Sequence, residues 1–158
     1  MEKGIFNGYG DGTFKPDKPI SRLEVTSIIK RTFELAPSNV TLPFSDLANS
    51  NASMVEELKA VFSAGIVLGD GTGKFNPNNP VTREEIALML MRATEEFSGI
   101  PFQPKESTQF EDVGNLSDES RRAISFLLEK GAVDAAKNYN PKKPLTRAGA
   151  AKIFSQLK

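Results

Sequence analysis

One stretch of the sequence decides the fold: Gly65-Ile-Val-Leu-Gly-Asp-Gly-Thr-Gly-Lys-Phe-Asn-Pro-Asn-Asn-Pro-Val-Thr-Arg-Glu-Glu85. Residues 4–24 align with this stretch without gaps, and ten of the 21 positions are identical. Residues 131–149 form a third copy that is two residues shorter. Ordered identities that recur along a chain in this way indicate structural repeats.

A short element precedes the glycine-rich stretch in two of the copies. It reads Phe44-Ser-Asp46 in one and Phe110-Glu-Asp112 in the other, each starting 21 residues before Gly65 or Gly131. The residues between carry apolar side chains at three- and four-residue steps, which predicts a helix that buries one stripe. These apolar residues are Val55, Leu58, Val61 and Phe62 in one copy, and Ala123, Ile124, Leu127 and Leu128 in the other. We expect the two glycines to end these helices in the left-handed conformation.

A second helix is predicted after each glycine-rich stretch. Ser21-Arg-Leu-Glu24 and Thr82-Arg-Glu-Glu85 match the capping box, in which a hydroxyl and a carboxylate bind the exposed amides of the first turn. Thr146 takes the cap position in the third copy. The apolar stripes of these helices are Val25, Ile28, Ile29 and Phe33; Ile86, Met89, Leu90, Ala93 and Phe97; and Ala150, Ile153, Phe154 and Leu157.

The sequence therefore predicts a mostly α fold of three helix-loop-helix repeats that share one core as a pseudo-threefold, three-pronged bundle. We expect repeat 1 at residues 1–35, repeat 2 at 44–97, a linker at 98–109 and repeat 3 at 110–158, together forming one pseudo-trimeric domain. Glycine and two prolines make the linker the segment expected to be flexible. Residues 1–5 align with 128–132, so the first repeat is expected to lack its opening helix.

Composition excludes several classes of function. The 158 residues include 20 basic and 20 acidic side chains, with no histidine, cysteine or tryptophan. The missing histidines and cysteines exclude catalytic triads, thiol catalysis, cysteine zinc sites and disulfides, so we expect no enzyme, metal or cofactor. Zero net charge argues against nucleic-acid binding. There is no apolar run of the length that spans a bilayer and no signal-peptide pattern in this chain, so no membrane insertion is expected.

The repeated motifs resemble the S-layer homology repeat of bacterial surface proteins. The resemblance rests on Phe-x-Asp, on Gly8-Tyr-Gly-Asp-Gly-Thr-Phe14 and on the Ser/Thr-Arg-x-Glu start of the second helix. It implies a three-pronged module that binds secondary cell-wall polysaccharide, often with pyruvylated sugars, and holds a protein on the bacterial cell surface, in the cell wall or S-layer. It also implies export, with self-association in a surface layer left open.

The same resemblance implies roles for particular residues. Arg22, Arg83 and Arg147 would contact a ligand carboxylate, and the glycines that let sugar approach the backbone would be Gly8 and Gly69. The Phe-x-Asp aspartates, Asp46 and Asp112, complete the set of residues that the resemblance implies for polysaccharide binding. This chain departs from the family pattern because it lacks the family's tryptophan, because residues 133–138 replace the glycine loop, and because Gly149 stands where the motif has glutamate. We expect the middle copy to be the most intact and the third groove to be weakened.

Two interpretations of the repeated arginine stay open at this stage. A guanidinium beside free first-turn amides would form a planar anion site that suits a carboxylate. Alternatively, each arginine pairs with a structural carboxylate, such as Asp46, Asp112, Glu24 or Glu85. The corresponding alternative function is a protein–protein contact module of a surface array, and a glycosidase is a distant third.

Overall fold

The computed structural model of the chain describes residues 15–106 and 109–157, and these contain helices but no strand. The helices are α1 (Arg22–Thr32), α2 (Ala52–Ser63), α3 (Arg83–Ser98), α4 (Asp118–Glu129) and α5 (Arg147–Ser155). The prediction of a mostly α fold is confirmed. None of the described helices is both long and apolar enough to cross a membrane.

The three repeat helices α1, α3 and α5 begin where the capping residues predict. Ser21 and Thr82 each accept a hydrogen bond from the backbone of the glutamate three residues on, and that glutamate binds the amide of the cap residue in return. Thr146 caps α5 by accepting from the amide of Gly149, where no carboxylate is present to complete the box. The capping residues are therefore structural, as the local sequence predicts.

The two outer helices, α2 and α4, each end at a residue with left-handed backbone. The residue after the last turn is Gly65 at φ 77° for α2 and Gly131 at φ 73° for α4. Both conformations disfavour a residue with Cβ, which explains why glycine recurs there. The predicted ends of these two helices are confirmed.

A closed ring of backbone hydrogen bonds forms the centre of the fold. The amide of Ile20 donates to the carbonyl of Leu145 at 3.0 Å, Leu145 donates to Val81 at 2.9 Å, and Val81 donates to Ile20 at 3.0 Å. All three side chains are buried. Each residue immediately precedes the cap of its repeat helix, so the ring relates the three repeats by a pseudo-threefold arrangement.

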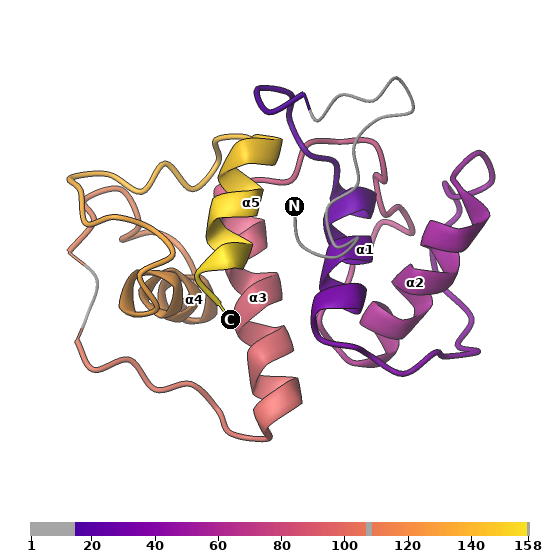
Figure 1. Cartoon of the computed structure of the whole chain (residues 1–158), viewed down its shortest axis with the longest axis horizontal. Helices are drawn as coiled ribbons and strands as arrows, with labels where there is room; N and C mark the ends of the chain where they lie inside the picture. Colours follow the sequence, from indigo (N-terminus) through magenta and orange to yellow (C-terminus); the bar gives the residue numbers. More distant parts are fainter. Residues whose placement is uncertain (1–14, 107–108, 158) are drawn as a thin grey trace.

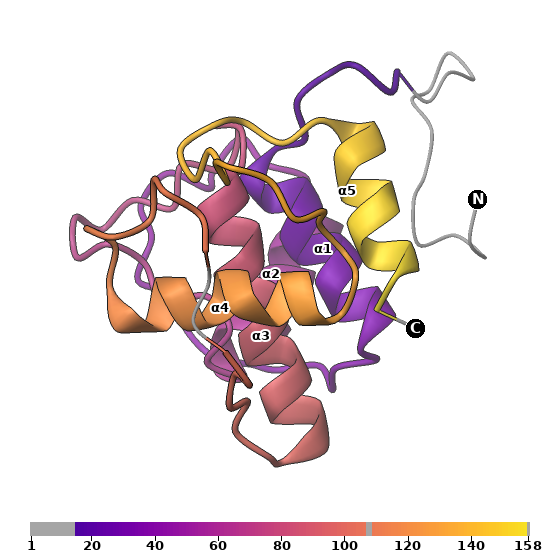
Figure 2. The ribbon, with the colours of Figure 1, turned by 90° about the vertical axis from the view of Figure 1, so that its left-hand side faces the viewer.

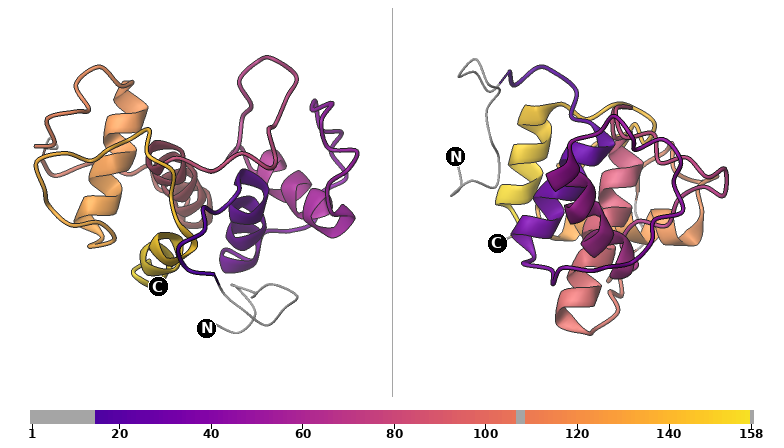
Figure 3. Two further views of the ribbon diagram at one scale, coloured as in Figure 1. Left: turned by 90° about the horizontal axis from the view of Figure 1, so that it is seen from above. Right: turned by 90° about the vertical axis from the view of Figure 1, so that its right-hand side faces the viewer.

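The repeat helices α1, α3 and α5 lie at the centre, and the outer helices α2 and α4, each of which forms a prong, lie outside them. In Figure 1, α2 and α4 occupy opposite ends of the long axis, with α1, α3 and α5 between them, and the view from above in Figure 3 shows the same order. Helix α2 packs on α1, and α4 packs on α3. Figure 2, seen from the α4 end, shows α4 running across the front of α3. Each prong therefore joins the central helix of one repeat to the outer helix of the next.

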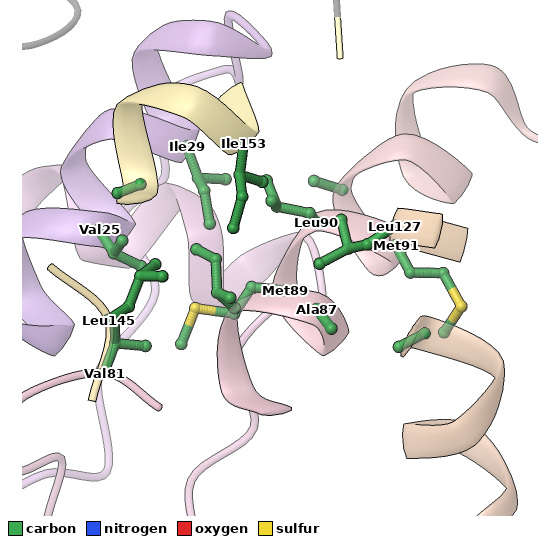
Figure 4. Close-up of a cluster of buried hydrophobic side chains, with 14 of the residues drawn as sticks. Val25, Ile29, Val81, Ala87, Met89, Leu90, Met91, Leu127, Leu145 and Ile153 are labelled. Atoms are coloured by element: carbon green, nitrogen blue, oxygen red, sulfur yellow. The ribbon is translucent and has the colours of Figure 1, made fainter. Parts of the chain in front are cut away.

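Apolar side chains from all three central helices meet in one core. Figure 4 shows Ile29 of α1, Leu90 of α3 and Ile153 of α5 converging, with Val81 and Leu145 of the central ring close by. Met91 and Leu127 extend the core toward α4. The predicted stripes are buried at these positions because the helices face one another across the pseudo-threefold centre.

The segment between repeats 2 and 3 is held against the helices over its described part. Gly99 ends α3 at φ 71°, and the amide of Phe102 donates to Glu95 at 2.8 Å. Arg122 of α4 binds both the Glu95 carboxylate and the Phe102 carbonyl. Phe102 is thus tied to α3 and α4, while most of the residues around it in 98–106 are exposed. The predicted lack of an opening helix in repeat 1 concerns residues that lie outside the described part.

Candidate functional site

The first-turn amides of the repeat helices are not free, which corrects one sequence-based expectation. In each helix the first two amides donate to carbonyls in the loop of another repeat at 2.9–3.1 Å. The pairs are Arg22 with Asn79, Leu23 with Pro77, Arg83 with Lys143, Glu84 with Pro141, Arg147 with Lys18, and Ala148 with Pro16. The third amide binds the capping hydroxyl. A helix N-terminus therefore contributes no free amide to an anion site, because packing between repeats satisfies those groups.

The guanidinium of Arg22 lies in the seam between repeats 1 and 2. Its Nε donates to the carbonyl of Phe75 at 2.8 Å, and its Cζ lies 4.9 Å from the centre of the Phe75 ring. Its Nη1 pairs with the carboxylate of Glu85. Desolvation by burial lowers the pKa of Arg22, although the charges of Asp70 and Asp46 oppose that effect. The interpretation of a structural ion pair with a neighbouring glutamate thus applies to this arginine.

Arg147 makes the equivalent pair between repeats 3 and 1. Its Nη1 lies 2.6 Å from Glu24 Oε2, and its side chain is only 4% exposed. Glu24 also accepts the amide of Ser21 through its other oxygen. One glutamate therefore caps α1 and neutralises a buried arginine of α5.

Arg83 occupies the corresponding place between repeats 2 and 3 but lacks this pair. Its Nε donates to the carbonyl of Tyr139 at 2.8 Å, and its guanidinium lies 4.6 Å from the Tyr139 ring centre. The Tyr139 hydroxyl donates back to the Arg83 carbonyl at 2.8 Å, and desolvation by burial raises the pKa of that hydroxyl. Within residues 15–106 and 109–157, Arg83 forms no ion pair. The position of Glu24 and Glu85 is held here by Gly149.

The two Phe-x-Asp aspartates hold the end of the glycine-rich loops. Asp46 accepts the amides of Phe75 and Asn76 at 2.9 and 2.8 Å, and Asp112 accepts those of Tyr139 and Asn140 at 2.8 Å. Desolvation raises the pKa of each carboxyl, but these amide hydrogen bonds outweigh it and leave both pKa values lowered. Both oxygens of each carboxylate are thus bound to the loop that carries the ring beneath Arg22 or Arg83.

Of the two glycines expected to let sugar approach the backbone, only Gly69 lies in the described part of the chain. Gly69 has φ +76°, and a Cβ placed there would lie 2.9 Å from Cε1 of Phe44. Both facts require glycine for reasons internal to the fold. Gly8 lies outside the described residues.

A groove of about 450 Å³ opens beside Arg22 at the seam between repeats 1 and 2. The 66–80 loop and the first half of α3 form most of its walls. Three cations and two acids line it: Arg22, Lys74, Arg92, Asp70 and Glu85. The exposed side chain of Leu68 adds an apolar surface. The groove brings Arg22 and Gly69 together, whereas Arg83, Arg147, Asp46 and Asp112 are not among its lining residues.

Sequence reasoning missed Lys74 and Arg92. Arg92 binds the carboxylate of Glu119 through two nitrogens and donates to the carbonyl of Ile66 at 3.2 Å, so it is already engaged. Lys74 is exposed and makes no ion pair with another described residue. Lys74 does not recur in the other copies, and therefore the repeat pattern carries no signal for it. Arg92 recurs as Arg31 in the first copy, so the alignment of repeats 1 and 2 could have pointed to it. Among the described residues there is no cluster of three or more acidic side chains that could hold a metal ion.

Comparison with known proteins places these features in a family. The model of the S-layer homology domain matches residues 2–26, 43–87 and 109–151. The chain is 30% identical over 158 residues to an endoglucanase of Bacillus sp. (strain KSM-635), covering 99% of this chain and 16% of that protein. It is 27% identical over 162 residues to the surface-layer 125 kDa protein of Lysinibacillus sphaericus, covering 99% of this chain and 13% of that protein.

A third relative is the S-layer protein sap of Bacillus anthracis, which is 28% identical over 158 residues, or 99% of this chain and 19% of that protein. The chain thus spans less than a fifth of the length of these three relatives. The family matches and the surface-layer relatives indicate an anchoring module associated with the cell wall at the cell surface. Because the three matched segments together cover more than half of its residues, the chain belongs to the S-layer homology domain family.

Proposed function

We propose that this chain binds an anionic secondary cell-wall polysaccharide, with pyruvylated sugars as the ligand groups, and so tethers a surface protein to the bacterial wall. The observation that carries the proposal is the S-layer homology match in three segments. The chain itself catalyses nothing in this proposal. The enzyme names among its relatives belong to proteins of which it covers only a small part.

The groove beside Arg22 supplies suitable chemistry for a charged sugar. Lys74 is an exposed cation free to meet a ligand carboxylate, and Arg22 is partly neutralised by Glu85. The Leu68 side chain is 60% exposed and offers an apolar face for the C–H groups of a sugar ring. The volume of the groove, about 450 Å³, falls in the range of small-ligand clefts. In a chain that has no tryptophan, Leu68 would provide the surface on which a sugar ring packs.

The remaining candidate residues take supporting roles in the proposal. Gly69 keeps the groove loop in its left-handed conformation, while Asp46 and Asp112 fix the loops that position the arginines. Arg147 is buried beside Glu24, so its contribution to binding is indirect. Gly8 stays a proposed contact by family resemblance.

A sedimentation assay with purified cell-wall sacculi tests the proposal. We expect the chain to co-sediment with intact sacculi and to stay in solution after chemical removal of the non-peptidoglycan polymer. Equal sedimentation with extracted sacculi would contradict polysaccharide binding. It would favour instead a module for protein contact in a surface array, for which Phe97 and Ile100, 73% and 70% exposed, provide apolar surface.

A further inference from the structure

An aromatic cluster forms beside the outer helix of repeat 2. The ring centre of Phe44 lies 5.3 Å from that of Phe75 and 5.7 Å from that of Phe62, which meets it edge to face at 83°. Gly69, in the loop after α2, comes so close that a Cβ placed there would lie 2.9 Å from Cε1 of Phe44. Two rings and a close-packed loop therefore surround Phe44.

Repeat 3 keeps one of these rings and replaces the other. The ring centre of Phe110 lies 5.4 Å from that of Tyr139, which is the contact that corresponds to the Phe44–Phe75 pair. Leu128 of α4 stands where repeat 2 has Phe62, and Ala135 stands where it has the close-packed glycine. The loop after α4 is also two residues shorter. Since leucine is smaller than phenylalanine, the side chain of α4 fills less space here.

A cavity of about 400 Å³ lies at this place in repeat 3. Phe110, Leu128, Ala135 and Ala136 provide its apolar walls. A closed apolar cavity of about 150 Å³ is enough to hold benzene. The cavity beside α4 therefore has room for an aromatic ring together with the chain that carries the ring.

The cavity also has one buried hydroxyl group. Ser125 lies on the same face of α4 as Leu128, one turn earlier, and lines the cavity although it is only 5% exposed. Within residues 15–106 and 109–157, the Ser125 hydroxyl makes no hydrogen bond. A buried polar group without a partner is unfavourable, so an occupant that supplies a hydrogen bond is favoured over an apolar one of the same shape.

Charged side chains mark where the cavity opens to solvent. Lys105, Glu106 and Glu129 line it and are exposed. The amide of Lys105 donates to Oε2 of Glu129 at 2.9 Å, which fixes this edge of the opening to α4. An apolar interior with polar groups at its edge suits a side chain that enters from a peptide, because the peptide backbone then lies beside charged partners.

We infer that this cavity binds a tyrosine side chain of a partner protein, with the ring in the space that Phe62 fills in repeat 2 and the hydroxyl donating to Oγ of Ser125. Phe110 would meet the ring edge to face, as Phe44 meets Phe62. A tyrosine that is buried on binding needs a partner for its hydroxyl, and Ser125 provides one. The inference goes beyond the proposed function, because none of the cavity residues lines the groove beside Arg22.

A titration with N-acetyl-tyrosinamide, followed by the methyl resonances of Ala135 and Ala136, tests the inference. We expect saturable shifts with this probe, binding about two- to tenfold weaker for N-acetyl-phenylalaninamide, which lacks the hydroxyl, and no shift with N-acetyl-alaninamide. We also expect p-cresol, which has the ring without the peptide groups, to bind more weakly. No saturable shift, or equal shifts with the alanine amide, would overturn the inference. Equal affinity for p-cresol would overturn the assignment to a protein partner.

Leu128→Phe places the ring of repeat 2 in the cavity and should block it. We expect the affinity for N-acetyl-tyrosinamide to fall by about tenfold or more, because a filled cavity leaves no space for a second ring. Leu68→Phe is the matched control, since it makes the same change at an exposed leucine outside the cavity. Unchanged affinity in Leu128→Phe, or an equal loss in the control, would contradict the assignment.

Ser125→Ala tests the hydroxyl separately and serves if Leu128→Phe does not unfold cooperatively. The variant should bind the tyrosine and phenylalanine amides equally well, since it removes the acceptor and keeps the apolar walls. A preference for tyrosine that persists in Ser125→Ala would overturn the proposed hydrogen bond. Both variants should still co-sediment with sacculi as the unsubstituted chain does, and loss of that binding would contradict the independence of the two sites.

Discussion

Replacing Glu24 by glutamine isolates the ion pair that joins repeat 3 to repeat 1. Glutamine keeps the capping hydrogen bond, because its carbonyl oxygen can still accept the amide of Ser21, now 3.0 Å from Oε1 of Glu24. The other end of the side chain changes from an acceptor to a donor. That donor would face Nη1 of Arg147, which now lies 2.6 Å from Oε2 of Glu24. The substitution therefore removes the ion pair and leaves the helix cap in place.

The expected cost follows from how deeply each partner is buried. Arg147 is 4% exposed and Glu24 is 30% exposed. Breaking a fully buried pair costs about 3–5 kcal/mol, whereas a surface pair is worth about 0–1 kcal/mol. Because one partner is buried and the other is partly solvated, we expect Glu24→Gln to lower the free energy of unfolding by about 2 kcal/mol. For a chain of this size that corresponds to a fall in Tm of about 4–8 °C.

Urea unfolding followed by far-ultraviolet circular dichroism measures this cost. Glu56→Gln is the control, because Glu56 forms an exposed pair with Lys59 at 2.8 Å within one helix. The control is expected to change the free energy of unfolding by less than about 0.5 kcal/mol. An equally small effect for Glu24→Gln would refute the argument that the inter-repeat pair holds the seam together.

Three further perturbations test the loops and the groove. Asp46→Asn should lower the free energy of unfolding by about 1–3 kcal/mol at pH 7. Because the pKa of Asp46 is lowered in the folded state, the stabilisation is present above about pH 4 and lost at lower pH. In urea unfolding, the stability difference between the unsubstituted chain and the variant should therefore shrink in acid, and a difference that does not change with pH would contradict this. Gly69→Ala should lower the free energy of unfolding more than Gly71→Ala in the same assay. Both glycines have positive φ, but only at Gly69 would an added Cβ lie within 3 Å of Phe44. Equal losses of stability would show that the close approach to Phe44 is relieved at no cost. Lys74→Gln should weaken binding to sacculi roughly two- to fivefold and reduce its salt dependence, and unaltered binding would remove Lys74 from the proposed groove.

The helices were predictable because their signals are local. The hydroxyl of Ser21 or Thr82 and the glutamate three residues later define a helix start within a single turn, and the structure has both capping boxes. Gly65 and Gly131 likewise mark helix ends through a backbone preference that needs no tertiary partner. The repeat itself then predicts that the three units share a core, which the central ring of Ile20, Val81 and Leu145 confirms.

The chemistry of the seams was not predictable to the same degree, because it depends on contacts between residues far apart in the chain. Arg22 and Glu85 are 63 positions apart, and Arg147 and Glu24 are 123 apart. The pairing order could not be read from one repeat, since each glutamate also caps its own helix. The first-turn amides looked free for the same reason: their acceptors lie in the loop of a different repeat.

The groove residues were missed for a different reason. Lys74 lines the groove at a position that does not repeat, so periodicity cannot identify it. Arg92 recurs as Arg31 in the first copy, but it lies outside the motifs that carry the family resemblance. Asp46, which the family resemblance places among the ligand-binding residues, also has a role in the fold, since its carboxylate binds the amides of Phe75 and Asn76. Repetition identifies what every unit needs to fold at least as readily as what a single groove needs to bind.

The most direct test of the account is a calorimetric titration of the chain with soluble cell-wall polysaccharide, before and after its carboxyl groups are reduced to alcohols. Recognition through guanidinium and ammonium groups requires the negative charge of the ligand. We predict saturable binding to the intact polymer, weakened by added salt, and loss of that binding after carboxyl reduction. Undiminished binding to the reduced polymer would contradict the claim that this module recognises an anionic sugar.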